Sequence, residues 1–108
     1  MSEFVKSQFA LAATTLTDIY TCPPGRKVNI ILYLCNRGGA TTFRISIAKD
    51  GAANANSQYI YYDTVIAANT TLREAFPLNE GDVIRAYAGS ADLSVNTFPD
   101  SSDEIATI

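Results

Sequence analysis

The chain reads CNRGGATTFRISIAK from Cys35 to Lys49, directly after the apolar run Val28–Cys35. Arg37-Gly38-Gly39 contains residues that tolerate positive φ, and it therefore predicts a turn. Beyond the turn the side chains alternate, with apolar residues such as Phe43 and Ile45 on one side and polar residues on the other. Alternation with period two is typical of a half-buried strand. We therefore predict two strands that a short glycine turn joins into a β-hairpin.

Short segments of this kind, separated by turn residues, recur along the chain. Pro23-Pro24-Gly25 and Pro77 are expected to end strands, and Asn79-Glu80-Gly81-Asp82 predicts a tight turn. The segment Lys27–Cys35 is the most apolar, which predicts either burial on both faces or a central position in a sheet. The predicted strands are Phe4–Ala12, Leu16–Cys22, Lys27–Cys35, Ala40–Ala48, Gln58–Ile66, Thr70–Phe76, Asp82–Ala88 and Asp92–Phe98.

Length and strand spacing define the fold class. The 108 residues suit one domain. About eight short strands without helix-period windows indicate an all-β protein, and two packed antiparallel sheets predict a single β-sandwich that is jelly-roll-like or a related Greek key. We assign residues 1–99 to this β-sandwich domain and residues 100–108 to an acidic C-terminal tail. The tail is either a free end or an arm that docks on a neighbouring subunit through Ile105 and Ile108.

Charge and composition exclude several partners. The net charge is −3, and the 8 Lys and Arg residues are scattered without a basic stripe, so we expect no nucleic-acid partner. No apolar run approaches the roughly 20 residues of a membrane span, so no membrane partner is expected. The N-terminus lacks a secretory pattern, which predicts synthesis in a cytoplasm. Cys22 and Cys35 are then expected to be reduced, buried apolar residues, although a disulfide stays open.

The chain contains few residues of the types that support catalysis or bind metal ions. The chain contains 0 His, which removes the commonest general base and the usual zinc ligands. Glu80 and Asp82 offer a carboxylate pair for calcium or for glycoside hydrolysis, but a solvated turn is the simpler interpretation. We therefore predict no enzymatic activity, no cofactor and no resident metal ion.

Three tyrosines on one predicted strand are the most distinctive aromatic feature. Alternation places Tyr59 and Tyr61 on one face, with Asp63, and Tyr62 on the other, with Ile60. Such residues stack on sugar rings or fill a protein interface, or they pack in the core with bonded hydroxyls. Both interpretations stay open.

Four segments resemble small all-β virion structural proteins of tailed bacteriophages. The first is Ile19–Arg26, which reads IYTCPPGR and has Cys22 where the group has a small apolar residue. The second is Cys35–Gly38 followed by Thr41–Ala48, the third is Tyr59–Asp63 followed by Ile66–Leu72, and the last is Leu78–Tyr87. Together they spread the resemblance over residues 19–98, as a pattern of strands and turns without a catalytic signature. The acidic tail looks like an addition to the group's pattern.

The resemblance implies a part of a phage particle. Its first implication is a capsid decoration (cement) protein that stabilises the head by bridging shell subunits; the alternative is a tail, baseplate or fibre-associated binding module that contacts the host surface. The expected partners are the major capsid protein or other virion proteins, with a homotrimer as the expected assembly and with synthesis in the host bacterial cytoplasm before incorporation into the virion. The candidate interface residues are Phe4, Val5, Phe9, Tyr59, Tyr61, Tyr62, Ile105 and Ile108.

Overall fold

The protein is an all-β sandwich. The computed structural model describes residues 7–99 and 104–105. Eight strands form two four-stranded antiparallel sheets that pack face to face, which confirms the predicted fold class, and a short ninth strand is added to the first sheet. The strands are β1 (Ser7–Ala10), β2 (Thr17–Thr21), β3 (Arg26–Asn36), β4 (Thr41–Ala48), β5 (Tyr59–Ile66), β6 (Thr71–Asn79), β7 (Val83–Ala88), β8 (Leu93–Pro99) and β9 (Glu104–Ile105).

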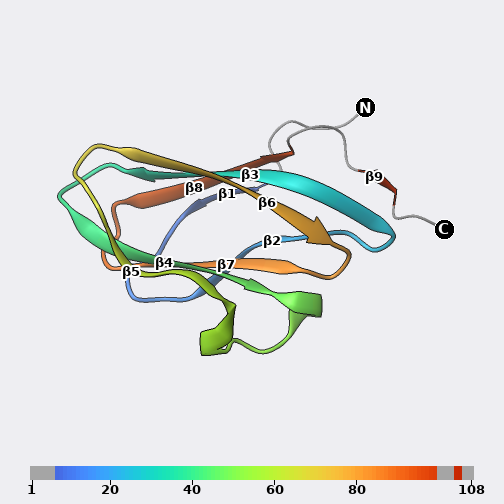
Figure 1. Ribbon diagram of the computed structural model, residues 1–108. Coiled ribbons are helices and arrows are strands. Elements are labelled where there is room, and N and C mark those ends of the chain that lie inside the picture. Colours follow the sequence, from blue (N-terminus) through green and yellow to red (C-terminus); the bar gives the residue numbers. More distant parts are fainter. Residues whose placement is uncertain (1–6, 100–103, 106–108) are drawn as a thin grey trace.

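The strand order is that of a jelly roll. Sheet A has the order β1-β8-β3-β6, with β9 paired to β3, and sheet B has the order β2-β7-β4-β5. Figure 1 shows the two sheets as stacked layers. From β1 to β8, successive strands alternate between the sheets except at β4 and β5, which pair as neighbours. This interleaving joins two Greek keys into one sandwich.

The predicted hairpin over residues 28–48 is wrong. Strand β3 lies in sheet A and β4 in sheet B, so the turn between them carries the chain across the sandwich. Gly38 has no positive φ; the Asp92 side chain lies so close that an added Cβ would force this exposed carboxylate to move. Both strands have an apolar inner face, and packing across the sandwich buries that face as well as pairing in a hairpin would. The alternation pattern therefore cannot distinguish the two arrangements.

The side chain of Asn36 organises this crossing. Asn36 is 1% exposed, and its amide Nδ2 donates to the carbonyls of Gly39 at 2.9 Å, Ala67 at 3.1 Å and Ile66 at 3.3 Å. Its Oδ1 accepts from the Gly38 N–H at 3.0 Å. One buried amide therefore joins the β3–β4 turn to the β5–β6 connection.

The core lies between the sheets and follows the period-two pattern. In β3, Val28, Ile30, Leu32 and Leu34 are buried while the residues between them face outward and are at least partly exposed. The strand is therefore not buried on both faces. It is apolar because it lies centrally, between β8 and β6, and its inner face meets residues of sheet B across the core.

Pro77 does not end its strand, contrary to the prediction. Strand β6 continues to Asn79, and Pro77 pairs with Asn29 of β3. On the described path of sheet A, β6 is an edge strand. A proline lacks the N–H that a central strand must donate, but an edge strand has one side without a ladder, and there the missing donor costs nothing.

Irregular pairing in β5 changes which side chains share a face. Asp63 has φ 48°, and the register between β4 and β5 shifts twice. Each shift reverses the inward–outward sequence. As a result Tyr59 and Tyr62 contact each other, and the predicted grouping of Tyr59 with Tyr61 is wrong.

The two cysteines carry thiols and are not joined in a disulfide. Cys22 is buried, whereas Cys35 lies on the outer side of β3 and is half-buried, so the prediction that both are buried is wrong for Cys35.

The predicted acidic tail is described only in part. Glu104 and Ile105 form β9 and pair with Lys27 and Arg26. The candidate interface residues Phe4, Val5 and Ile108 lie outside the described residues.

Candidate functional site

A cluster of tyrosines around one arginine lies on the outer face of sheet B. The Arg44 guanidinium stands 4.2 Å from the ring centre of Tyr62 and 4.4 Å from that of Tyr87. Its Nε donates to Asp63 Oδ1 at 2.6 Å and its Nη2 to Asp63 Oδ2 at 3.3 Å. Tyr59 contacts Tyr62 with ring centres 4.9 Å apart. We call Arg44, Tyr59, Tyr62, Asp63 and Tyr87 the tyrosine–arginine cluster.

The cluster borders a hollow beside the 49–58 loop. Asn56, Tyr59 and Tyr62 line this hollow, whose volume is about 450 Å³. Figure 1 shows the loop below sheet B, between β4 and β5. The Asn54 side-chain amide donates to the Tyr59 hydroxyl at 3.2 Å, so the loop holds one of the rings that form the wall.

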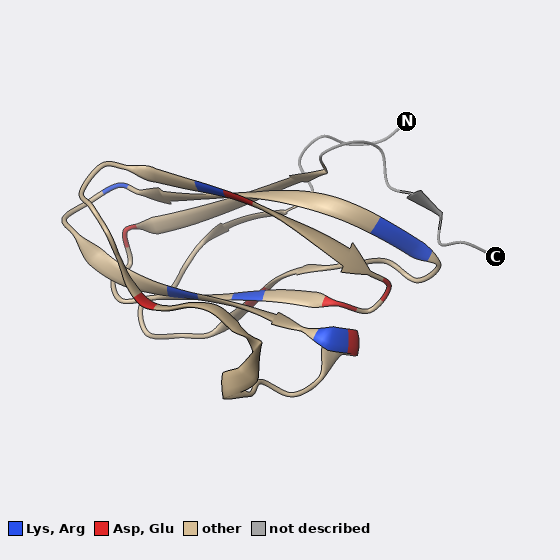
Figure 2. Cartoon of the chain, in the orientation of Figure 1, with Lys and Arg blue, Asp and Glu red and all other residues tan. Residues whose placement is uncertain are grey.

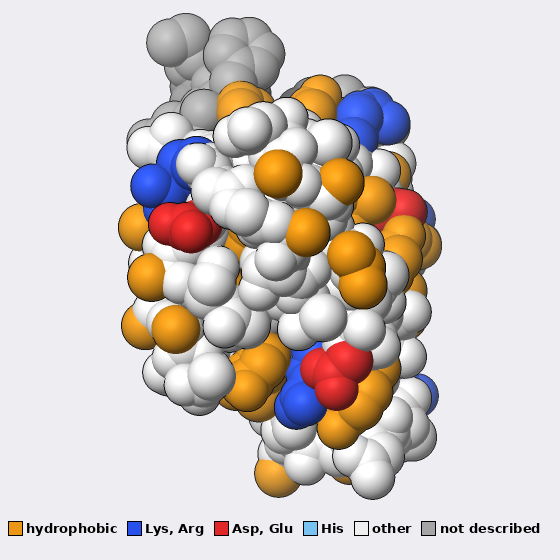
Figure 3. Space-filling model, turned by 90° about the vertical axis from the view of Figure 1, so that its left-hand side faces the viewer, with side chains coloured by type: hydrophobic (Ala, Val, Ile, Leu, Met, Phe, Trp, Pro, Cys, Tyr) orange, Lys and Arg blue, Asp and Glu red, His pale blue; other side chains and the backbone are white. Residues whose placement is uncertain are grey.

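Charges on this face are paired. The hydrogen bond to Asp63 raises the pKa of the Arg44 guanidinium above its ordinary value. A second pair, Arg85 Nε to Asp18 Oδ1 at 2.9 Å, lies on the same face. Figure 2 shows acidic and basic residues spread over both layers, and on the end of the sandwich in Figure 3 opposite charges mostly lie next to each other. The visible surfaces therefore do not concentrate charge of one sign.

The outer face of sheet A is different, because a few aromatic and aliphatic side chains gather on it among polar ones, with the exposed Arg73 directly opposite Tyr33. Ile31, Tyr33, Asn96 and Phe98 line a shallow hollow of about 630 Å³. The rings of Tyr33 and Phe98 meet edge to face, with centres 5.6 Å apart. Ala75 pairs with Ile31 and extends this surface onto β6. We call Ile31, Tyr33, Ala75, Asn96 and Phe98 the apolar face.

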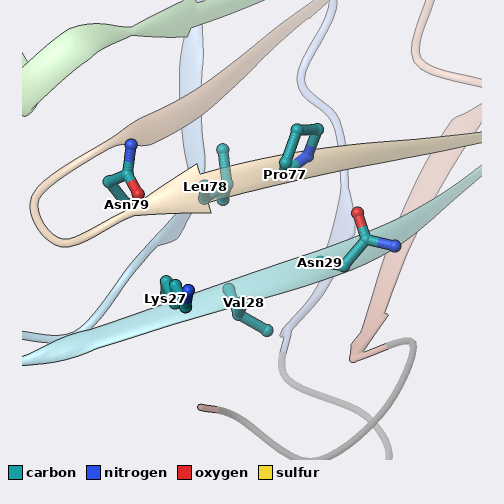
Figure 4. A pocket seen from close by; sticks show the side chains of 6 residues that line it. All are labelled: Lys27, Val28, Asn29, Pro77, Leu78 and Asn79. Atoms are coloured by element: carbon teal, nitrogen blue, oxygen red, sulfur yellow. The ribbon is translucent and has the colours of Figure 1, made fainter. Parts of the chain in front are cut away.

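The apolar face has a polar end. A smaller hollow of about 260 Å³ lies where β3 and β6 run side by side, and Figure 4 shows its lining. Lys27, Asn29 and Asn79 supply the polar groups there, next to Pro77. The surface thus combines an aromatic centre with a polar margin, which is the usual composition of a protein interface.

The predicted interface residues are only partly brought together. Tyr59 and Tyr62 share the cluster, whereas Phe9 is 37% exposed on β1, where it pairs with the buried Val95. Sequence reasoning missed Arg44 and Tyr87, because they come from other strands. It also missed Ile60 and Val65, whose apolar side chains are exposed on β5. The alternation of β5 is broken, so the sequence pattern does not show which of its apolar residues face solvent.

Tyr61 is not on this surface. Its ring packs against Phe43 in the core, with centres 5.2 Å apart, and its hydroxyl donates to the Glu74 carboxylate of β6. The bond joins the edge strands of the two sheets. This hydrogen bond, followed by burial, raises the pKa of Tyr61 above its ordinary value.

The raised pKa of Tyr61 predicts a loss of stability in alkali. Above about pH 10, where an unfolded tyrosine ionises, the unfolded chain releases this proton more readily than the folded one. The free energy of unfolding should therefore fall as the pH rises through this window. Urea titrations at about pH 9 and about pH 11 measure the fall, which should be smaller in Tyr61→Phe and Glu74→Gln. An equal fall in wild type and Tyr61→Phe contradicts this assignment.

The Asp82 carboxylate of the 79–82 turn has a structural role. Asp82 Oδ2 accepts from the Asn79 N–H at 2.9 Å, and Oδ1 accepts from the Asp50 N–H at 3.0 Å. Gly81 has φ 85°, which completes the predicted tight turn. Within residues 7–99 and 104–105, no group of three His, Cys, Asp or Glu side chains is placed to hold a metal ion.

The described part of the chain has no helix with the length and hydrophobicity that crossing a membrane requires. Comparisons with protein-family models, with curated proteins and with solved structures gave no match.

Proposed function

We propose that the protein is a virion structural protein of a tailed bacteriophage, a capsid decoration (cement) protein that stabilises the head by bridging shell subunits. The observation that carries the proposal is the apolar face: Ile31, Tyr33 and Phe98 lie at least partly exposed on the outer face of sheet A. Interfaces are enriched in aromatic residues and arginine, and this face combines Tyr33 and Phe98 with Arg73, which lies opposite Tyr33. The resemblance of residues 19–98 to phage virion proteins supports the assignment.

The mechanism is mechanical. The apolar face docks on the major capsid protein, and assembly as a homotrimer presents three copies of it at once. Each contact needs only modest affinity, because the second and third contacts form at high effective concentration. A bridge of this kind adds buried interface between shell subunits and raises the force needed to separate them. No chemical step is involved.

A tail, baseplate or fibre-associated binding module is the second candidate. The tyrosine–arginine cluster favours it, because Tyr and Arg are the side chains that most often dominate recognition surfaces. Such a module is present at the tail in a small fixed number of copies. A decoration protein is present on the head in proportion to the major capsid protein.

Particle composition and binding test the proposal. We expect mass spectrometry and electron microscopy of intact particles to place the protein on the head. With particles that lack it, purified Tyr33→Ala and Phe98→Ala should each bind weaker by about 2 kcal/mol, roughly thirtyfold in Kd. Val65→Ala, on the other sheet, is the matched control and should bind like wild type. Location at the tail, or wild-type binding by both aromatic variants, contradicts the proposal.

A further inference from the structure

The hollow beside the 49–58 loop is built from two aromatic walls. The rings of Tyr59 and Tyr62 meet at 78°, so together they form a corner. Tyr62 is 55% exposed although it is a large aromatic residue. The hollow of about 450 Å³ falls within the range of roughly 300–1,000 Å³ that small-molecule sites occupy.

Both walls are held in place before any ligand arrives. Arg44 stacks on Tyr62 and is itself fixed by two hydrogen bonds to Asp63. The Tyr59 hydroxyl accepts from Asn54. The rings therefore lose little freedom when a ligand binds, which removes one of the main costs of binding.

The chemistry of the walls selects among ligands. Aromatic faces are electron-rich, so they attract the weakly positive C–H groups that line one side of a pyranose ring. The Asn56 amide, which also lines the hollow, and the Tyr hydroxyls donate and accept hydrogen bonds, as sugar hydroxyls require. Arg44 is neutralised by Asp63, so the site offers no free positive charge to an acidic sugar or a phosphate.

We infer that the corner formed by Tyr59, Tyr62 and Asn56 is a binding site for a neutral pyranose saccharide. The sugar ring packs against the Tyr62 side chain, and the Asn56 side-chain amide contacts the hydroxyls of the sugar. The site lies on the outer face of sheet B and the apolar face lies on that of sheet A. A molecule docked through sheet A therefore still presents the saccharide site, and the inference does not depend on the proposed function.

Nuclear magnetic resonance of the full-length ¹⁵N-labelled protein tests the inference. The probes are maltotriose, chitotriose, mannotriose and a galactose disaccharide, together with a glucuronate-containing disaccharide as an acidic comparison; a glycan array widens the search. We expect at least one neutral probe to shift amides of residues 54–63 saturably. The acidic sugar should bind more weakly.

Variants distinguish a sugar site from nonspecific association with the protein surface. Tyr62→Ala should weaken binding at least about tenfold, as loss of an aromatic anchor does. Val65→Ala, another exposed β5 side chain, and Tyr33→Ala, on the opposite sheet, should bind like wild type. The ¹⁵N spectrum of each variant reports whether it is folded. If Tyr62→Ala is not folded, Tyr59→Phe replaces it; this variant removes only the hydroxyl and should also weaken binding.

Three outcomes overturn the inference. They are the absence of saturable shifts across all probes and the array, equal binding by Tyr62→Ala and wild type, and a preference for the acidic sugar. If Tyr62→Ala instead lowers binding to particles while no saccharide shifts the spectrum, the cluster is a protein contact and the saccharide site is rejected.

Discussion

Replacing Asn36 with alanine is expected to lower the free energy of unfolding by about 3 kcal/mol. The residue is 1% exposed, and alanine removes its buried bond to the carbonyl of Ile66 together with its part-buried bonds to Gly39, Ala67 and Gly38. Each buried polar group left without a partner costs about 1–3 kcal/mol. The substitution weakens both the β3–β4 turn and the β5–β6 connection, because the Asn36 amide joins them.

Urea unfolding followed by circular dichroism measures this effect. Asn29→Ala is the matched control, since Asn29 is the same residue type on the same strand but lies exposed on the outer side of β3. Its effect should stay under about 1 kcal/mol. Equal losses in the two variants would show that the Asn36 amide does not organise the turns.

Leu32→Ala should have an effect of similar size, a loss of about 3 kcal/mol. Leu32 is 0% exposed in the central strand of sheet A, and truncation leaves a cavity that the surrounding core cannot close. The neighbouring residue supplies the control. Ile31 points to the apolar face and is half-buried, so Ile31→Ala should cost about 1 kcal/mol or less.

The pair tests the register of β3 as well as the packing. A strand shifted by one residue would exchange the two side chains between core and surface. A larger loss for Ile31→Ala than for Leu32→Ala in urea unfolding would therefore contradict the observed register of β3. Ile31→Ala also removes part of the proposed docking surface, so its folding and its particle binding can be compared in one variant.

The strands were predictable from local pattern, but their partners were not. Each predicted segment overlaps one of β1 to β8, since inward alternation and turn residues are local properties. Whether β3 pairs with β4 or packs above it is decided by distant residues. The 35–49 segment buries its apolar face in either arrangement. Of the sequence features, only the number of predicted strands, eight, indicated the jelly roll. Pro77 shows the same limit, because an edge position is invisible from the sequence.

The candidate site was predictable in part for the same reason. Tyr59 and Tyr62 stood out as members of a tyrosine-rich strand. Their contact depends on the register shifts around Asp63, whose positive φ carries no local signature. Arg44 and Tyr87 come from other strands and join the cluster only through the pairing of β4 with β5 and β7.

The pairing of β1 with β8 has a consequence for how the protein is made. Ser7 and Thr97 bond through their hydroxyls at 2.6 Å although 90 positions separate them. A ribosome must therefore complete residues 7–97 before β1 can pair with β8 and close sheet A, and folding that relies on such distant pairs is slow, typically milliseconds to seconds. A truncated product that stops before Leu93 would leave the flank of β3 uncovered and open to chaperones and proteases.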